Sequence, residues 1–133
     1  MQLLNLPSAD FRVRNNGNRR EIFDPVRKRF VALTPEEWVR QNFIQYLNGI
    51  KNYPLSLLGI EIPLVYNGLK KRCDILVCNN SGKPRLIVEC KAPEVKISQD
   101  VFHQVAIYNM AMNVEFLVVT NGLDHFICRI DHE

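Results

Sequence analysis

The stretch CDILVCNNSGKPRLIVECK, residues 73–91, joins two apolar runs through a polar segment. Valine, isoleucine and leucine fill both runs, as in β-strands, and residues 79–84 are typical turn formers. The pattern therefore predicts a β-hairpin. Charged residues interrupt it, because Asp74 opens the first strand whereas Glu89 and Lys91 close the second. Charges in strands that are otherwise suited to burial need a compensating interaction.

The expected register of this hairpin brings two carboxylates together. A turn centred between Ser81 and Gly82 pairs Asp74 with Glu89, because each lies seven positions from the centre. Directly opposed residues have Cβ atoms roughly 4.5–5.5 Å apart, so the two carboxylates would repel each other unless a cation lies between them. Mg²⁺ or Mn²⁺ bound by carboxylate oxygens would remove this repulsion.

The residues next to this pair fit the same hypothesis. Lys91 lies on the face of Glu89, where it would orient or deprotonate an attacking water or stabilise transition-state charge. The carbonyl of Cys90 offers a further oxygen ligand, and its thiol is expected on the opposite face. The alternative is a cross-strand salt-bridge cluster of Asp74, Glu89 and Lys91 on a solvated face.

The pattern of the whole chain predicts two helices and several further strands. Thr34 is the expected N-cap of a first helix, Pro35 its first residue, and Glu37 completes a capping box. Strands are predicted at 59–66, 73–78, 85–91, 115–120 and 125–130, and a second helix at 98–112. The order hairpin, α, βββ, α, ββ belongs to the α/β (α+β) class.

The second helix carries two polar residues on its expected inward stripe. Gln104 and Tyr108 are four positions apart, among the apolar residues Ile97, Val101, Val105 and Met112. A glutamine inside an apolar stripe needs hydrogen-bond partners. We expect this pair either to face the carboxylate site and a DNA phosphate, or to be ordinary polar residues of the core.

Basic residues are concentrated near the N-terminus. Residues 11–29 hold seven of the 17 Lys and Arg side chains, against two acidic ones, around an Asn16-Gly17 step that predicts a hairpin. This basic arm is either a solvated hairpin edge or a surface for phosphates. The candidate DNA contacts are Arg12, Arg14, Lys70, Lys71 and Arg72.

Composition sets the limits of these predictions. The 133 residues carry a formal net charge of +3 and are 47% hydrophobic, as in an ordinary globular domain. No apolar run approaches the roughly 18 residues of a membrane-spanning helix, and the first residues lack signal-peptide character. We therefore expect a single cytoplasmic domain without a membrane partner. The four cysteines lack zinc-site spacing and are expected to be free thiols.

Several of these residues together resemble a known family. The series of Asp74, then Glu89-Cys90-Lys91, then Gln104 to Tyr108 is similar to the D…ExK…QxxxY motifs of PD-(D/E)xK phosphodiesterases. In particular, residues 34–130 resemble the N-terminal nuclease domain of the R subunit of type I restriction enzymes. Cys73 stands where the superfamily motif has its proline.

The resemblance implies a restriction-endonuclease-like core at 34–130, with a mixed central β-sheet flanked by α-helices, and an N-terminal hairpin extension at 1–33. It implies a Mg²⁺-dependent DNA endonuclease in which Asp74 and Glu89 bind metal and Lys91 is catalytic. Gln104 and Tyr108 would support the site, and Glu37 is either a helix cap or a first-helix metal ligand.

The resemblance also raises alternatives for the biological role. No GxxxxGK[ST] phosphate loop is present, so ATP-driven translocation is not expected of this polypeptide, and other subunits of a restriction system are its implied partners. One alternative is a non-catalytic DNA-binding or assembly module that keeps the nuclease fold. Another is an RNA or nucleotide phosphodiesterase with the same chemistry.

Overall fold

The structure, a computed structural model, describes residues 1–109 and 113–130. Its helical segments are α1 Pro35–Gln45, the π-helical η1 Tyr46–Ile50, the 3-10 turn η2 Leu55–Leu57 and α2 Gln99–Asn109. Its strands are β1 Val13–Asn16, β2 Arg19–Asp24, β3 Arg29–Ala32, β4 Leu58–Tyr66, β5 Leu69–Cys78, β6 Pro84–Cys90, β7 Phe116–Thr120 and β8 His125–Arg129.

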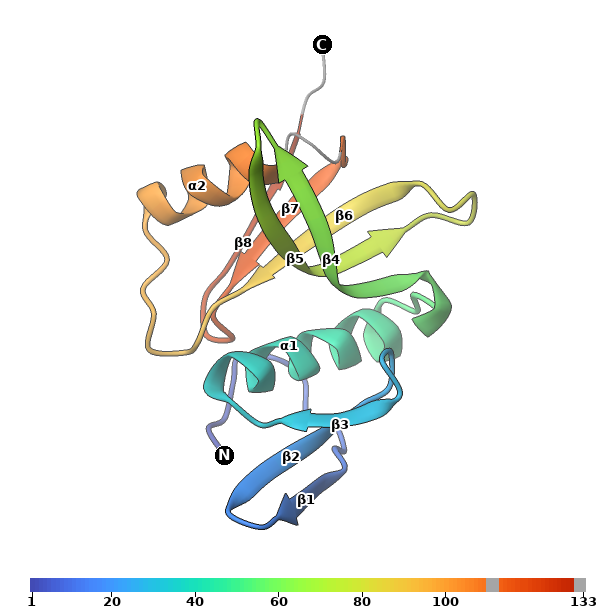
Figure 1. The fold of residues 1–133 in the computed structure, drawn as a ribbon, viewed down its shortest axis with the longest axis vertical. Coiled ribbons are helices and arrows are strands. Elements are labelled where there is room, and N and C mark those ends of the chain that lie inside the picture. Colours follow the sequence, from blue (N-terminus) through green and yellow to red (C-terminus); the bar gives the residue numbers. More distant parts are fainter. Residues whose placement is uncertain (110–112, 131–133) are drawn as a thin grey trace.

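The strands form two sheets (Figure 1). The larger sheet has the order β4-β5-β6-β7-β8, and it is mixed because β6 and β7 run parallel whereas its other neighbours are antiparallel. The smaller sheet has the order β1-β2-β3, and α1 lies between the two sheets (Figure 1). The predicted α/β class, with a mixed central sheet flanked by helices, is confirmed.

Two apolar clusters attach the helices to opposite faces of the larger sheet. On one face, α1 packs Val39, Phe43 and Ile44 against a cluster that includes Val88 and Cys90. On the other face, the cluster contains Leu76, Ile87, Val105, Leu117 and Val119, with Val105 contributed by α2. In the described part of the chain, no helix is long and apolar enough to span a membrane.

The N-terminal hairpin forms as expected, but it is part of a larger unit. Asn16 pairs with Arg19 across a two-residue turn in which Gly17 has a φ of +65°, a conformation that glycine adopts readily. The third strand, β3, was not predicted. It pairs with β2 from Arg29 to Ala32, and the N-terminal unit is therefore a three-stranded sheet rather than a hairpin.

The β5–β6 hairpin has the predicted register where the carboxylates lie. Ile75 pairs with Val88 and Val77 with Leu86, and the same register continued by one residue places Asp74 opposite Glu89. Nearer the turn, a shift between Val77 and Cys78 changes the pairing by one residue. The irregularity is confined to the turn side, so it leaves the carboxylate register intact.

Helix α2 begins as predicted, but its buried face is rotated. Ser98 is the N-cap, since its Oγ accepts a hydrogen bond from the N–H of Val101 at 3.2 Å. Val105 is buried and Phe102 and Ala106 pack beside it, whereas Gln104 is exposed. The prediction that Gln104 lies on the inward stripe is therefore wrong. The side chain of Tyr108 and all of residue 112 lie outside the described residues.

Candidate active site

The site lies where β5 and β6 approach the first turn of α1. Asp74 comes from β5, Glu89 from the end of β6, and Lys91 from the residue after Cys90. Parallel pairing with β7 fixes this end of β6, because the N–H of Lys91 donates to the carbonyl of Thr120 at 2.8 Å. The sheet therefore holds the predicted acidic pair and the predicted lysine together.

Asp74 lies at a break in the regular alternation of β5. Cys73 and Leu76 pack on the α2 side of the sheet, whereas Ile75 packs on the α1 side. At this point the Asp74 carboxylate turns to the neighbouring strand, where its Oδ2 accepts a hydrogen bond from the N–H of Cys90 at 2.7 Å. Its Oδ1 lies 3.6 Å from Nη1 of Arg40 on α1.

Glu89 is almost fully buried and incompletely satisfied. Its exposed fraction is 2%, and among the described residues its Oε1 has no hydrogen-bond partner. Its Oε2 lies 3.7 Å from Nζ of Lys71. Burial and the negative charge of Asp74 raise the pKa of Glu89 to about 8, although Lys71 and Lys91 act in the opposite direction. Hydrogen bonding to Asp74 also raises this pKa, so the two carboxyl groups lie within reach of each other.

Lys91 and Glu36 complete the charged surroundings of the site, and the sequence did not indicate a role for Glu36. Loss of solvent around its carboxylate and the charge of Asp74 raise the pKa of Glu36, while Lys91 lowers it. Glu36 is in the first turn of α1, so this helix presents an acid to the site beside Lys91. Two adjacent acids follow Pro35, and the sequence held no signal to tell which one faces the strands.

Glu37, the acid that was singled out, is a structural residue. Thr34 Oγ1 accepts from the N–H of Glu37 at 3.0 Å, as in a capping box. The Glu37 carboxylate does not complete the box, because it accepts hydrogen bonds from Arg27, Arg40 and Gln41 at 2.6–3.1 Å. Burial acts to raise the pKa of Glu37, but these hydrogen bonds hold it below its ordinary value. The backbone of Glu37 thus takes part in the predicted helix cap, while its carboxylate belongs to an ion-pair and hydrogen-bond network.

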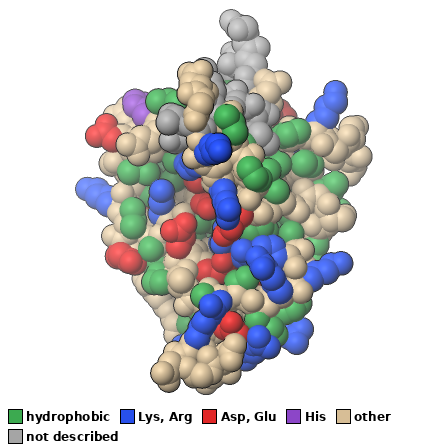
Figure 2. Space-filling view, in the orientation of Figure 1, with side chains coloured by type: hydrophobic (Ala, Val, Ile, Leu, Met, Phe, Trp, Pro, Cys, Tyr) green, Lys and Arg blue, Asp and Glu red, His purple; other side chains and the backbone are tan. Residues whose placement is uncertain are grey.

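The predicted DNA contacts fall into two groups. Lys70 and Arg72 are exposed on β5, and Arg72 reaches Glu61 at 3.3 Å, whereas Lys71 is paired with Glu89. Arg12 and Arg14 lie over aromatic rings of the smaller sheet. Figure 2 shows acidic side chains in the middle of one face with lysines and arginines around them.

The donor set can be compared with what a divalent cation requires. Mg²⁺ is commonly held by one or two carboxylates and completes its shell with water. Asp74 and Glu89 supply the carboxylates, and the unpartnered Glu89 Oε1 is a free ligand atom. No group of three or more His, Cys, Asp or Glu side chains suited to a metal occurs among the described residues. The two carboxylates therefore fit a water-rich magnesium site, not a fully enclosed one.

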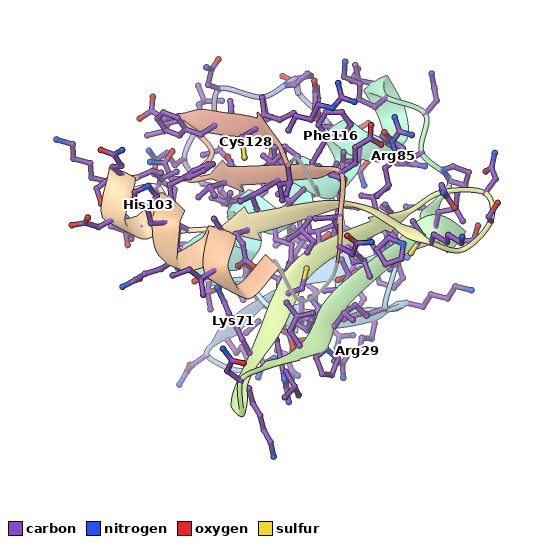
Figure 3. All side chains as sticks on the ribbon, turned by 90° about the horizontal axis from the view of Figure 1, so that it is seen from above. Arg29, Lys71, Arg85, His103, Phe116 and Cys128 are labelled. Carbon is purple, nitrogen blue, oxygen red and sulfur yellow. The ribbon has the colours of Figure 1, made fainter. Side chains whose placement is uncertain are left out.

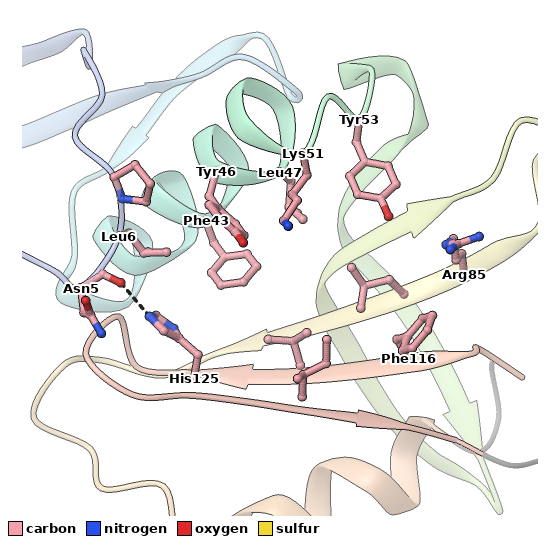
Figure 4. Close-up of a pocket in the computed structure, with 14 residues that line it drawn as sticks. Asn5, Leu6, Phe43, Tyr46, Leu47, Lys51, Tyr53, Arg85, Phe116 and His125 are labelled. Carbon is pink, nitrogen blue, oxygen red and sulfur yellow. Dashed lines mark hydrogen bonds between the residues drawn. The ribbon is translucent and has the colours of Figure 1, made fainter.

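An apolar pocket lies elsewhere in the molecule. It has a volume of about 480 Å³ and lies between α1, η1 and the strands β6 to β8 (Figure 4). Its lining is mainly apolar and aromatic, with Lys51 and Arg85 as its cations, and none of Asp74, Glu89 and Lys91 lines it. In Figure 3, Arg85 and Phe116 lie well apart from Lys71, which marks the acidic site.

Comparison with known proteins places this geometry in context. No curated protein and no solved structure matches the chain. A family model described as type I restriction enzyme R protein N terminus (HSDR_N) matches residues 35–133, which include α1, the whole larger sheet and the residues Asp74, Glu89 and Lys91. The chain therefore belongs to the family of type I restriction enzyme R protein N-terminal regions.

Proposed function

We propose that this chain is a Mg²⁺-dependent DNA endonuclease domain that hydrolyses phosphodiester bonds. The observation that carries the proposal is the buried Glu89 carboxylate, whose Oε1 has no partner in the described chain although Asp74 and Lys91 are close. A buried carboxyl oxygen that makes no hydrogen bond is costly, and such a cost is typical of a site whose ligand completes it.

The residues of the chain have different roles in the proposed hydrolysis. Asp74 and Glu89 would hold the cation, with the carbonyl of Cys90 as a further oxygen ligand. A bound magnesium ion lowers the pKa of water and neutralises phosphoryl charge. The Asp74 carboxylate is oriented for this role by the N–H of Cys90 at 2.7 Å. Lys91 would place its ammonium beside the scissile phosphate and stabilise the negative charge that develops there.

DNA is the substrate that the surroundings of the site favour. Family membership gives a restriction-enzyme context. Exposed cations, among them Lys70 and Arg72 on β5 and Arg12 just before β1, would bind backbone phosphates with little dependence on sequence. Gln104 is exposed on α2 and would reach DNA from solvent rather than from the core.

The test is cleavage of plasmid and linear DNA by the purified chain with Mg²⁺ or Mn²⁺ and with EDTA. Asp74→Ala and Lys91→Ala should each lower the cleavage rate about 10²-fold or more, the lower end of what a positioned proton-transfer or charge-stabilising group contributes. Lys83→Ala, which removes an exposed lysine in the β5–β6 turn, is the matched control and should cleave as wild type does. Equal cleavage by all four proteins would reveal a contaminant and refute the proposal.

A second candidate has one observation in its favour. The two carboxylates already have cationic neighbours, Arg40 for Asp74 and Lys71 for Glu89, which is also compatible with a non-catalytic DNA-binding module. The same assay separates the two functions. DNA binding without metal-dependent cleavage, unchanged in Asp74→Ala, would favour the module.

A further inference from the structure

The Arg40 guanidinium is enclosed by three carboxylates. Its Nη2 lies 2.6 Å from Glu37 Oε1 and 3.1 Å from Glu61 Oε1, and its Nη1 lies 3.6 Å from Asp74 Oδ1. These acids come from α1, β4 and β5. Arg27 also lies near two of these acids, 2.9 Å from Glu37 and 3.6 Å from Glu61, but Arg40 is the guanidinium that lies against Asp74.

This guanidinium is fixed in place. Arg40 is only 8% exposed, and Glu37 holds it through two hydrogen bonds, one to Nη2 and one to Nε at 2.9 Å. Glu37 is held in turn by Arg27 at 2.9 Å and by Gln41 at 3.1 Å. Because Nε and Nη2 are committed to these partners, Nη1 is the edge of the guanidinium that faces Asp74.

Glu61 contacts Arg40 from a strained backbone conformation. It has a φ of +55°, a left-handed conformation that costs a residue other than glycine roughly 1–3 kcal/mol. Glu61 and Asp74 interrupt the β4–β5 ladder between the pairs Ile60–Ile75 and Ile62–Cys73, so they occupy facing positions. The strained backbone is the place where Glu61 reaches Arg40.

Asp74 therefore lies between two places that suit a cation, one beside Glu89 and one beside Glu61. On the side of Glu89, the buried Oε1 of Glu89 has no partner in the described chain, and this position is open to a metal. On the side of Glu61, the Arg40 guanidinium occupies the space between the carboxylates. Two cations that share one carboxylate repel each other, and a fixed guanidinium disfavours a divalent ion on its own side.

We propose that Arg40 takes the place of a second divalent cation beside Asp74, so that the site binds a single metal ion and Asp74 is held toward Glu89. Arg40 is a positioning residue in this arrangement. The inference rests on the proposed function, because it assumes that the Asp74–Glu89 side binds a metal. Removal of Arg40 would leave the Glu61 and Asp74 carboxylates facing each other while Arg27 stays paired with Glu37, and carboxylate oxygens are the ligands that Mg²⁺ and Mn²⁺ prefer.

The number of Mn²⁺ ions bound per chain tests this inference without any measurement of cleavage. Isothermal titration of the full chain with Mn²⁺, in the absence of DNA, should give one ion for wild type and two for Arg40→Ala. Arg40→Lys, which restores a cation, should return the number to one. Arg40→Ala combined with Glu61→Gln should also bind one ion, because the new site loses a ligand.

Arg72→Ala is the matched control. It removes a cation that lies 3.3 Å from Glu61 but is exposed and does not contact Asp74, so it should leave one Mn²⁺ per chain. Circular dichroism establishes that each variant is folded. If Arg40→Ala does not fold, Arg40→Gln carries the same expectation of two ions, because it keeps an amide donor for Glu37 without a charge.

The outcomes separate this inference from the proposed function. One Mn²⁺ in wild type and one in both Arg40→Ala and Arg40→Gln would overturn the role of Arg40 while leaving the metal site beside Glu89. A wild-type chain that binds no Mn²⁺ would contradict the proposed function, and this inference with it.

Discussion

Glu37 and Glu89 are both buried carboxylates, with exposed fractions of 6% and 2%, and they differ in what surrounds them. Both oxygens of Glu37 accept hydrogen bonds from Arg27, Arg40 or Gln41, and its pKa lies below the ordinary value. Glu89 has an oxygen without a partner in the described chain, and its pKa is raised. Burial alone therefore does not distinguish the two carboxylates, whereas the oxygen of Glu89 that makes no hydrogen bond does.

The largest effect that this comparison predicts is on DNA cleavage. Glu89→Gln should lower the Mg²⁺-dependent cleavage rate by about 10³-fold or more, since a bound metal contributes several kcal/mol of transition-state stabilisation. Single-turnover plasmid cleavage under saturating Mg²⁺ measures this rate. The matched control is Glu115→Gln, which removes an exposed carboxylate just before β7. A Glu89→Gln protein that cleaves at the control rate would contradict the proposed difference in function between Glu89 and Glu37.

The second prediction concerns the satisfied carboxylate. Glu37→Gln should lower the free energy of unfolding by about 3 kcal/mol, because Arg40 and Arg27 lose their shared buried carboxylate, although Arg40 keeps Glu61 and Arg27 keeps Asp24. Urea denaturation of the metal-free proteins provides the measurement. A loss below about 0.5 kcal/mol would show that the Glu37 network contributes no more than an exposed pair does.

The third prediction uses the pH dependence of stability. The folded state binds the Glu89 proton more tightly than the unfolded chain does, because the pKa of Glu89 is raised from 4.5 to about 8. Its contribution to stability is therefore complete below pH 4.5 and is lost as the pH rises through about 8.

The corresponding experiment compares wild type with Glu89→Gln in EDTA at pH 5 and pH 8. Glu89→Gln should lack this pH dependence and should gain about 3 kcal/mol relative to wild type between the two pH values. A difference between the two proteins that stays constant from pH 5 to pH 8 would mean that Glu89 titrates normally in the fold.

The smallest predicted effect extends the comparison to the cations. Arg14 is 2.8 Å from Glu21, whereas Arg12 lies over the ring of Phe23 at 4.6 Å. Arg12 therefore keeps a charge that is available to a phosphate. Arg12→Gln should reduce the slope of log K against log salt by about 0.9 for duplex DNA, which fluorescence anisotropy measures.

Lys51→Gln, in the apolar pocket away from the site, is the control for this slope and should leave it unchanged. Equal slopes for wild type and Arg12→Gln would remove Arg12 from the DNA interface. The proposed cleavage site would remain, because it does not depend on this arm.

The sequence was sufficient for those parts of the site that depend on local pattern. The turn at residues 79–84 and the apolar runs beside it defined the pairing of Asp74 with Glu89, and the ladder confirms that register. Thr34 and Pro35 located the start of α1 correctly. Hydrogen-bonding and backbone preferences of single residues decide such features, so one sequence is enough to predict them.

Features that depend on distant contacts could not be predicted. Glu37 was read as a cap or a metal ligand, because its partner Arg27 belongs to a different element and neither spacing nor composition reveals that contact. Gln104 was placed inward, but Phe102 and Ala106 pack beside Val105, which rotates the buried face of α2. The strained Glu61 in β4 had no signal in the sequence.

The central claim is that the incompletely satisfied pair, Asp74 and Glu89, binds a divalent cation. Electron paramagnetic resonance of Mn²⁺ added to the metal-free chain, without DNA, tests it most directly by separating free from bound ions. The account predicts one bound Mn²⁺ in wild type and in Glu115→Gln, and at least tenfold weaker binding in Glu89→Gln. Binding of equal strength in Glu89→Gln, or no bound Mn²⁺ in wild type, would contradict it.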